Sequence, residues 1–170
     1  DGVINYDSTE YVKSEDELNF IPGSIDAIVQ LTQSGYQIGI ATNQSGIARG
    51  YYDETILANI HKKLLTHTHA AGGNIAAIEY CPHHPDHGCA CRKPKPGMLY
   101  TLAKRFDCDL SNTPFVGDKI SDIQAAQAAG AQPIFITSIN NKLNQLVQHE
   151  YPQVPMFNSL FDFVQSHIKK

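Results

Sequence analysis

Apolar residues recur along this chain with two spacings, one typical of amphipathic helices and one typical of buried strands. Between 24 and 34 they fall on one helical face, and the β-branched run YQIGIAT at 36–42 then predicts a strand. A long helix is predicted from the N-cap candidate Asp53 to the glycine pair that ends at Gly73. The alternation continues with predicted strands at 75–81, 113–118 and 132–138, and with predicted helices beginning at Pro96 and spanning 121–130, 140–149 and 158–169.

Strands that alternate with helices of this length predict an α/β fold. Right-handed crossovers then give a doubly wound, Rossmann-like parallel sheet with helices on both faces. We find no repeat, low-complexity tract or linker that would divide the chain, and 42% of its residues are hydrophobic. A single domain over 1–170 is therefore expected.

Charge and apolar content limit the partners of this domain. The formal net charge is −4, so no overall positive field would attract nucleic acid or an anionic membrane. No apolar run approaches the roughly 18 residues of a membrane span, and no signal peptide is recognised. The 4 cysteines are few and clustered, which favours a reducing compartment; Cys108 lies apart and is expected to be buried or partly buried. We expect a cytoplasmic protein.

The segment CPHHPDHGCAC contains two short clips with metal-ligand spacing. Cys81 and His83 form the first clip, Cys89 and Cys91 form the second, and HPDHG separates them. Three thiolates and one imidazole predict a closed tetrahedral site for structural Zn²⁺. The alternatives are a disulfide, free thiols, or one of the histidines at 84 and 87 in place of His83.

Polar residues gather where the predicted strands end, at ATNQSG, CRKP and VGDKISD, and DGVINYD at the start has the same character. In a doubly wound sheet the ligand site lies beyond these carboxyl ends. A hydroxyl, an amide, a lysine and carboxylates make a set suited to phosphoryl transfer with Mg²⁺. The candidates are Asp1, Thr42, Asn43, Lys93, Asp118 and Asp122.

DGVIN, TNQSG, CRKPKPGM and GDKISD resemble, in order and approximate spacing, the four motifs of haloacid dehalogenase (HAD) superfamily phosphatases. From Asp1 to about Thr137 the chain is most similar to the D-glycero-D-manno-heptose 1,7-bisphosphate 7-phosphatase family. The resemblance implies a HAD-like fold with no large cap domain and a zinc-clipped loop. It also implies a Mg²⁺-dependent phosphatase that forms an aspartyl phosphate and acts on a small phosphorylated sugar in lipopolysaccharide core biosynthesis.

The resemblance also implies a role for each matching residue. Asp1 matches the general acid/base and shares Mg²⁺ with Asp118, which Lys119 adjoins. Thr42 and Lys93 match the residues that stabilise the phosphoryl group. The residues implied in substrate binding are Asp7, Asn43, Gln44, Ser45 and Arg92, and the zinc ligands are Cys81, His83, Cys89 and Cys91.

This sequence departs from the family pattern at the first motif. The nucleophile of the family is the first aspartate of Asp-x-Asp, which would lie two positions before Asp1. We therefore expect that this sequence lacks an N-terminal strand and the nucleophile, rather than that the enzyme is naturally inactive.

Two other functions compete with the heptose bisphosphatase. The gap between His83 and Cys89 resembles histidinol-phosphate phosphatases, whereas TNQSGIARG and GDK resemble the heptose family. A zinc-clipped binding module without catalysis is the third candidate. Arg49 either reaches a second phosphate or stays exposed, and Asp122 either serves the metal site, caps a helix or pairs with Lys119. We expect a monomer that binds neither nucleic acid nor membranes.

Overall fold

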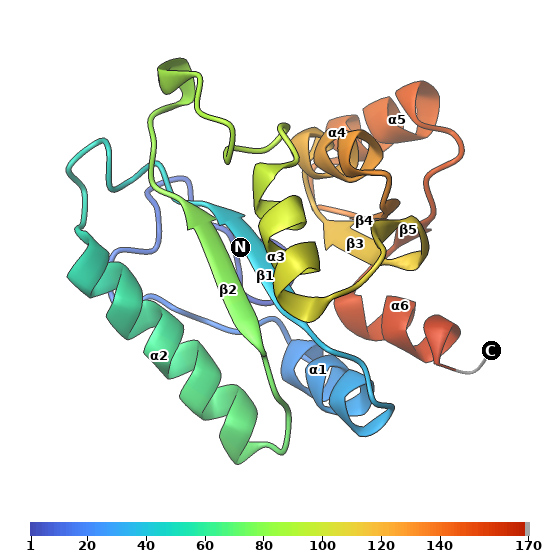
Figure 1. Cartoon of the computed structure of the whole chain (residues 1–170), viewed down its shortest axis with the longest axis horizontal. Helices are drawn as coiled ribbons and strands as arrows, with labels where there is room; N and C mark the ends of the chain where they lie inside the picture. Colours follow the sequence, from blue (N-terminus) through green and yellow to red (C-terminus); the bar gives the residue numbers. More distant parts are fainter. Residues whose placement is uncertain (169–170) are drawn as a thin grey trace.

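The computed structural model describes residues 1–168. Its helices and strands alternate through most of the chain, as Figure 1 shows. The strands are β1 (Gly39–Asn43), β2 (Ala77–Cys81), β3 (Pro114–Gly117), β4 (Gln132–Ile136) and β5 (Met156–Phe157). The α-helices are α1 (Ser24–Gln33), α2 (Glu54–Ala70), α3 (Gly97–Phe106), α4 (Ile120–Ala129), α5 (Asn141–Glu150) and α6 (Leu160–His167).

The strands form two parallel sets. β1 pairs with β2, placing Thr42 beside Tyr80, while β4 pairs with both β3 and β5. Within residues 1–168 no backbone ladder joins the two sets. The predicted α/β fold with parallel strands is confirmed, but the sheet expected to be continuous is in two parts here.

Successive residues of β1 face different cores, which shows that helices cover both faces of this strand. Ile40 packs against the core shared by α1, α2 and α6, and that core contains Ile28 and Val164. The next residue, Ala41, belongs to the core shared by α3 and α4, together with Met98. This period of two is the one expected for a strand buried on both sides.

The first residues of the chain connect the carboxyl ends of β1 and β3. The backbone of Gly2 has a positive φ of 76° and packs so tightly that a Cβ there would lie 2.1 Å from Asp118 Oδ2. On the other side, the Asp1 carboxylate accepts a hydrogen bond from Gln44, just after β1. The N-terminus is therefore close to β1, as Figure 1 also shows.

Two local predictions need correction, and one short strand was not predicted. The strand expected at 36–42 begins only at Gly39, because pairing with β2 starts there, and Tyr36 is 44% exposed. The two-residue β5 was not predicted, since it is too short for a hydrophobic period and exists through its pairing with β4. Cys108 is exposed because it follows Asp107, whose φ of 50° turns the chain away from α3.

The helices of this fold are short or amphipathic. Over residues 1–168, none combines the length and apolar character required to cross a membrane.

Candidate active site and metal loop

Lys93 lies at the centre of the predicted site. Its Nζ is 2.7 Å from Asp122 Oδ1 and donates a hydrogen bond of 2.7 Å to the carbonyl of Ala41 in β1. The same ammonium lies 5.6 Å from the centre of the Phe115 ring. Only 12% of the Lys93 side chain and 7% of the Asp122 side chain are exposed, so this ion pair is buried.

The contacts of Asp122 show which of the roles left open by the sequence it takes in this structure. Its Oδ2 accepts hydrogen bonds from the backbone N–H groups of Asp118 and Lys119, which caps the start of α4. Its other oxygen pairs with Lys93 rather than with the side chain of Lys119. A Cβ at Gly117 would lie 2.2 Å from Asp122 Cβ, so glycine gives this carboxylate room to approach.

Asp118 and Lys119 form a second charged group with Asp7. Lys119 Nζ lies 2.5 Å from Asp7 Oδ2 and 3.4 Å from Asp118 Oδ2. Burial raises the pKa of Asp118; Lys119 opposes this shift, and Asp122 adds to it. Burial by itself lowers the pKa of Lys119, but Asp118 and Asp7 bring it above its usual value. A cation beside Asp118 would stabilise its charged form.

The carboxylate of Asp1 is held from both sides. Asn5 donates to Asp1 Oδ1 over 2.7 Å, and Gln44 Nε2 approaches Asp1 Oδ2 at 3.4 Å. The same Gln44 nitrogen donates to Thr42 Oγ1 over 2.9 Å. The side chains of the first motif and of the loop after β1 are thereby brought together.

The segment between Cys81, at the end of β2, and Gly97, at the start of α3, is called the cysteine loop. Asn43 links β1 to the basic end of this loop. Its side chain donates to the carbonyl of Lys93 and accepts from the backbone N–H of Lys93, both at 3.1 Å. These paired bonds hold Lys93 against the strand. Further along, Ser45 is buried and Arg49 is exposed.

Sequence reasoning gave no role to Asn5 and Tyr52, although both lie in this site. Each side chain is only 5% exposed, and the Tyr52 hydroxyl donates to Gln44 Oε1. Asn5 belongs to DGVIN, so its position inside a motif was the available signal. Nothing in the local pattern around Tyr52 indicated its contact.

The four predicted zinc ligands come together. One ligand atom from each of Cys81, His83, Cys89 and Cys91 lies within 4.8 Å of all the others. The sulfur–sulfur distances are 3.3, 3.4 and 3.5 Å, and His83 Nδ1 is 3.6 and 3.3 Å from the sulfurs of Cys81 and Cys91. Zinc–ligand bonds of ordinary length would give edges of about 3.5–3.8 Å. The cysteines are free thiols, and their cluster fits a closed zinc site.

The cysteine loop is packed against the start of α3. A Cβ at Gly97 would lie 2.4 Å from the carbonyl oxygen of Ala90, between the last two cysteines. Arg92 follows these cysteines, and its Nη1 is buried without a hydrogen-bond partner among residues 1–168. A buried guanidinium nitrogen that lacks an acceptor is costly, so this geometry suits an anionic ligand.

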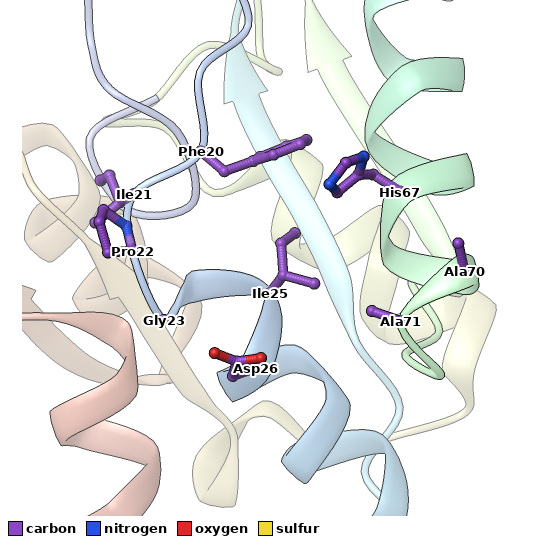
Figure 2. A pocket seen from close by; sticks show the side chains of 9 residues that line it. All are labelled: Phe20, Ile21, Pro22, Gly23, Ile25, Asp26, His67, Ala70 and Ala71. Atoms are coloured by element: carbon purple, nitrogen blue, oxygen red, sulfur yellow. The ribbon is translucent and has the colours of Figure 1, made fainter.

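A separate hollow of about 500 Å³ lies between the segment that enters α1 and the last turn of α2, as Figure 2 shows. Phe20, Ile25 and His67 are among its lining residues, and the lining contains none of the predicted site residues. The charged groups around Lys93, rather than this hollow, are therefore the candidate active site.

Comparisons with known proteins agree with this geometry. Residues 90–163 match a family model described as HAD-hydrolase-like. The D-glycero-β-D-manno-heptose-1,7-bisphosphate 7-phosphatase of Pseudomonas aeruginosa is 52% identical over 136 residues, covering 80% of this chain and 76% of that protein. The enzyme of the same name from Neisseria meningitidis is 43% identical over 97% of this chain and 89% of its own length.

A solved structure shows the same architecture. The crystal structure of D,D-heptose 1,7-bisphosphate phosphatase from B. bronchiseptica, complexed with magnesium and phosphate, superposes with a TM-score of 0.93 at 43% identity. The match covers 99% of this chain and 94% of that one.

Proposed function

Since the chain belongs to the D-glycero-β-D-manno-heptose-1,7-bisphosphate 7-phosphatase family of HAD-like hydrolases, we propose that it removes the 7-phosphate of this sugar bisphosphate. It is a Mg²⁺-dependent phosphoric monoester hydrolase whose product leads to the heptose of the lipopolysaccharide core. The observation that carries the proposal is the convergence of Asp1, Thr42, Lys93 and Asp118 around the carboxyl ends of β1 and β3, where Asp122 pairs with Lys93 and accepts from the Asp118 backbone.

Each residue of this set has a chemical task. Asp1 protonates the leaving sugar oxygen and then takes a proton from the attacking water. The nucleophile of the proposal is an aspartate two positions before Asp1, which forms the aspartyl phosphate. Residues at i and i+2 of a strand point the same way, so two such carboxylates can address one phosphorus atom.

Lys93 is arranged to bind the phosphoryl group as well as to stabilise the fold. A lysine ammonium has three N–H donors, and Asp122 and the carbonyl of Ala41 use two of them. The third donor remains for a phosphoryl oxygen. Asp1 and Asp118 are the residues that would hold Mg²⁺, because carboxylate oxygens suit this ion. The bound ion would offset the negative charge of the phosphate.

Arg92 supports a substrate with a second phosphate. Its buried Nη1 has no acceptor among residues 1–168, and a planar guanidinium binds phosphate oxygens with two parallel hydrogen bonds. Histidinol phosphate instead presents an amine and an imidazole at its distal end, for which an arginine is the wrong partner. The heptose bisphosphate therefore fits this position better than histidinol phosphate does.

The proposal includes a setting and a solution state. We place the reaction in the cytoplasm and propose a monomer without nucleic acid or membrane partners, since a net charge of −4 gives no overall positive field to attract them. Asp7, Asn43, Gln44 and Ser45 remain proposed substrate-binding residues. Sedimentation equilibrium should give the mass of a single chain.

The test is a comparison of substrates in protein that carries the complete Asp-x-Asp motif. With Mg²⁺ present, kcat/KM for heptose 1,7-bisphosphate should exceed that for histidinol phosphate by at least about 100-fold, because the site pairs a cation with a distal anion. Changing the first aspartate of the motif to asparagine is the control and should abolish turnover. A preference for histidinol phosphate would make the alternative function correct, and no turnover with an intact motif would favour the binding module.

A further inference from the structure

Tyr52 lies behind the candidate phosphoryl site and is linked to it by consecutive hydrogen bonds. Its hydroxyl donates to Gln44 Oε1 over 2.5 Å. The amide nitrogen of Gln44 is 2.9 Å from Thr42 Oγ1 and 3.4 Å from Asp1 Oδ2. One tyrosine therefore reaches, through a single amide, both the phosphoryl-binding hydroxyl and the general acid/base.

The chemistry of these groups determines which of them donates and which accepts each hydrogen bond. Gln44 Nε2 lies within hydrogen-bond distance of both Asp1 Oδ2 and Thr42 Oγ1, so the NH₂ end of the amide faces these two oxygens. The carbonyl end then faces Tyr52, whose hydroxyl must be the donor. Burial raises the pKa of Tyr52 to about 12, so this hydroxyl keeps its proton at neutral pH.

The direction of these hydrogen bonds determines whether the Thr42 hydroxyl can donate its proton to a ligand. A threonine hydroxyl has one proton to donate, and its oxygen here already accepts from Gln44. The Thr42 proton is therefore free to be donated to a phosphoryl oxygen. If the Gln44 amide turned over, its carbonyl would compete for that proton and would also face the Asp1 carboxylate.

The ring of Tyr52 is fixed where this role requires it. The side chain is 5% exposed, and a Cβ at Gly46 would lie 2.2 Å from its Cε1. The loop after β1 therefore folds directly onto the ring. A change to phenylalanine keeps this packing and removes only the hydroxyl.

We propose that Tyr52 is a positioning residue for phosphoryl transfer, which acts through the Gln44 amide to orient the Thr42 hydroxyl and the Asp1 carboxylate. The proposal rests on the phosphatase function given above. It adds to the site a residue that does not touch the substrate and acts through the Gln44 side chain.

The first test is a double-mutant cycle in magnesium-loaded protein with the complete Asp-x-Asp motif. Tyr52→Phe should lower kcat about tenfold and leave KM within about twofold, because the partly buried amide oxygen loses its donor. In a Gln44→Ala background the same change should have no further effect on kcat, since the hydrogen bonds from Tyr52 through Gln44 (the Tyr52–Gln44 relay) are already broken. An equal loss in both backgrounds would show that the Tyr52 hydroxyl acts independently of Gln44 and would overturn the proposal, as would a Tyr52→Phe enzyme with full activity.

The matched control is Tyr51→Phe, because this neighbouring tyrosine is 54% exposed and its ring makes a tilted contact with the ring of Tyr11. It should leave kcat and KM unchanged. A second readout does not depend on activity: solvent exchange of the Gln44 side-chain amide protons, followed by NMR, should be at least about tenfold faster in Tyr52→Phe. Unchanged exchange overturns the relay. An inactive wild type with slow Gln44 exchange would contradict the proposed function while supporting the relay.

Discussion

At the scale of single residues, the site depends on side chains that serve the fold and the chemistry together. Asp122 caps α4 with one carboxylate oxygen and neutralises Lys93 with the other. Because both partners of this ion pair are buried, neither can be removed without leaving a group that the interior does not tolerate.

Asp122→Asn tests this double role. The change keeps the volume and an acceptor for the cap but leaves the buried Lys93 ammonium unpaired, so the free energy of unfolding should fall by about 3–5 kcal/mol. Urea denaturation measures the loss. The control is Asp162→Asn, an exposed aspartate in the first turn of α6, which should cost less than about 1 kcal/mol. Similar losses in the two variants would contradict a buried pair.

Arg92→Ala tests substrate recognition. Loss of a charge-assisted contact to the distal phosphate should lower kcat/KM for heptose 1,7-bisphosphate by about 10–100-fold. A small monophosphate that lacks the distal group should be affected by less than about threefold. Arg105→Ala, at an arginine whose side chain is 58% exposed, provides the control. If Arg92→Ala lowers both activities equally, the arginine has a general phosphate-binding role.

At the scale of elements, the cysteine loop has little apolar core of its own. It carries Arg92 and Lys93, the two cations proposed to bind phosphate groups. It leaves β2 at Cys81 and returns to α3 at Gly97, with a single 3-10 turn (Pro85–His87) in between. The bonds from Asn43 fasten its end to β1, and the ligand cluster closes its middle. Arg92 and Lys93 directly follow the last ligand, so their positions depend on that closure.

Zinc removal tests this dependence. Purified protein should contain about one zinc per chain, and a chelator should increase hydrogen–deuterium exchange across 88–97, because the thiolates then lose the ion that holds them together. Cys89→Ser should reduce zinc content, whereas Cys108→Ser should retain it, since Cys108 is exposed and apart from the cluster. Elemental analysis that finds no zinc in unchelated protein would contradict the assignment.

At the scale of the whole molecule, the two sets of strands meet at the first residues of the chain. Asp1 contacts the loop after β1, and Gly2 packs on Asp118 after β3. We propose that the fold accommodates, between β1 and β3, a strand that ends in Asp-x before Asp1. Such a strand would supply the nucleophile and pair the facing backbone groups of the two sets.

Protein carrying that strand should hydrolyse phosphate monoesters with Mg²⁺, whereas the chain that starts at Asp1 should neither turn over substrate nor fold well. In the longer protein, Asp1→Asn should reduce kcat by about 10²–10⁴ through loss of the general acid/base. Phosphate release and thermal unfolding, measured side by side, check both statements. Unchanged activity of Asp1→Asn would remove this residue from its role.

The sequence by itself determined the features that depend on short spacings. Hydrophobic periodicity located all six α-helices and β1 to β4 of the described part of the chain, to within a few residues. The clip spacing predicted the four-residue ligand cluster, because ligands close in sequence need only a local loop to meet. The motifs also placed Thr42 and Asp118 at the carboxyl ends of predicted strands, and Lys93 in the loop that follows β2.

Tertiary structure alone decided which partner each polar group takes. Asp122 pairs with Lys93, Asn43 bonds to the Lys93 backbone, and Tyr52 bonds to Gln44. Each of these contacts depends on segments that packing brings together. A local pattern shows that a residue faces inward or ends a strand, but it contains no information about the side chain opposite. Buried polar groups must find partners, and the contacts between distant elements determine which partners are within reach.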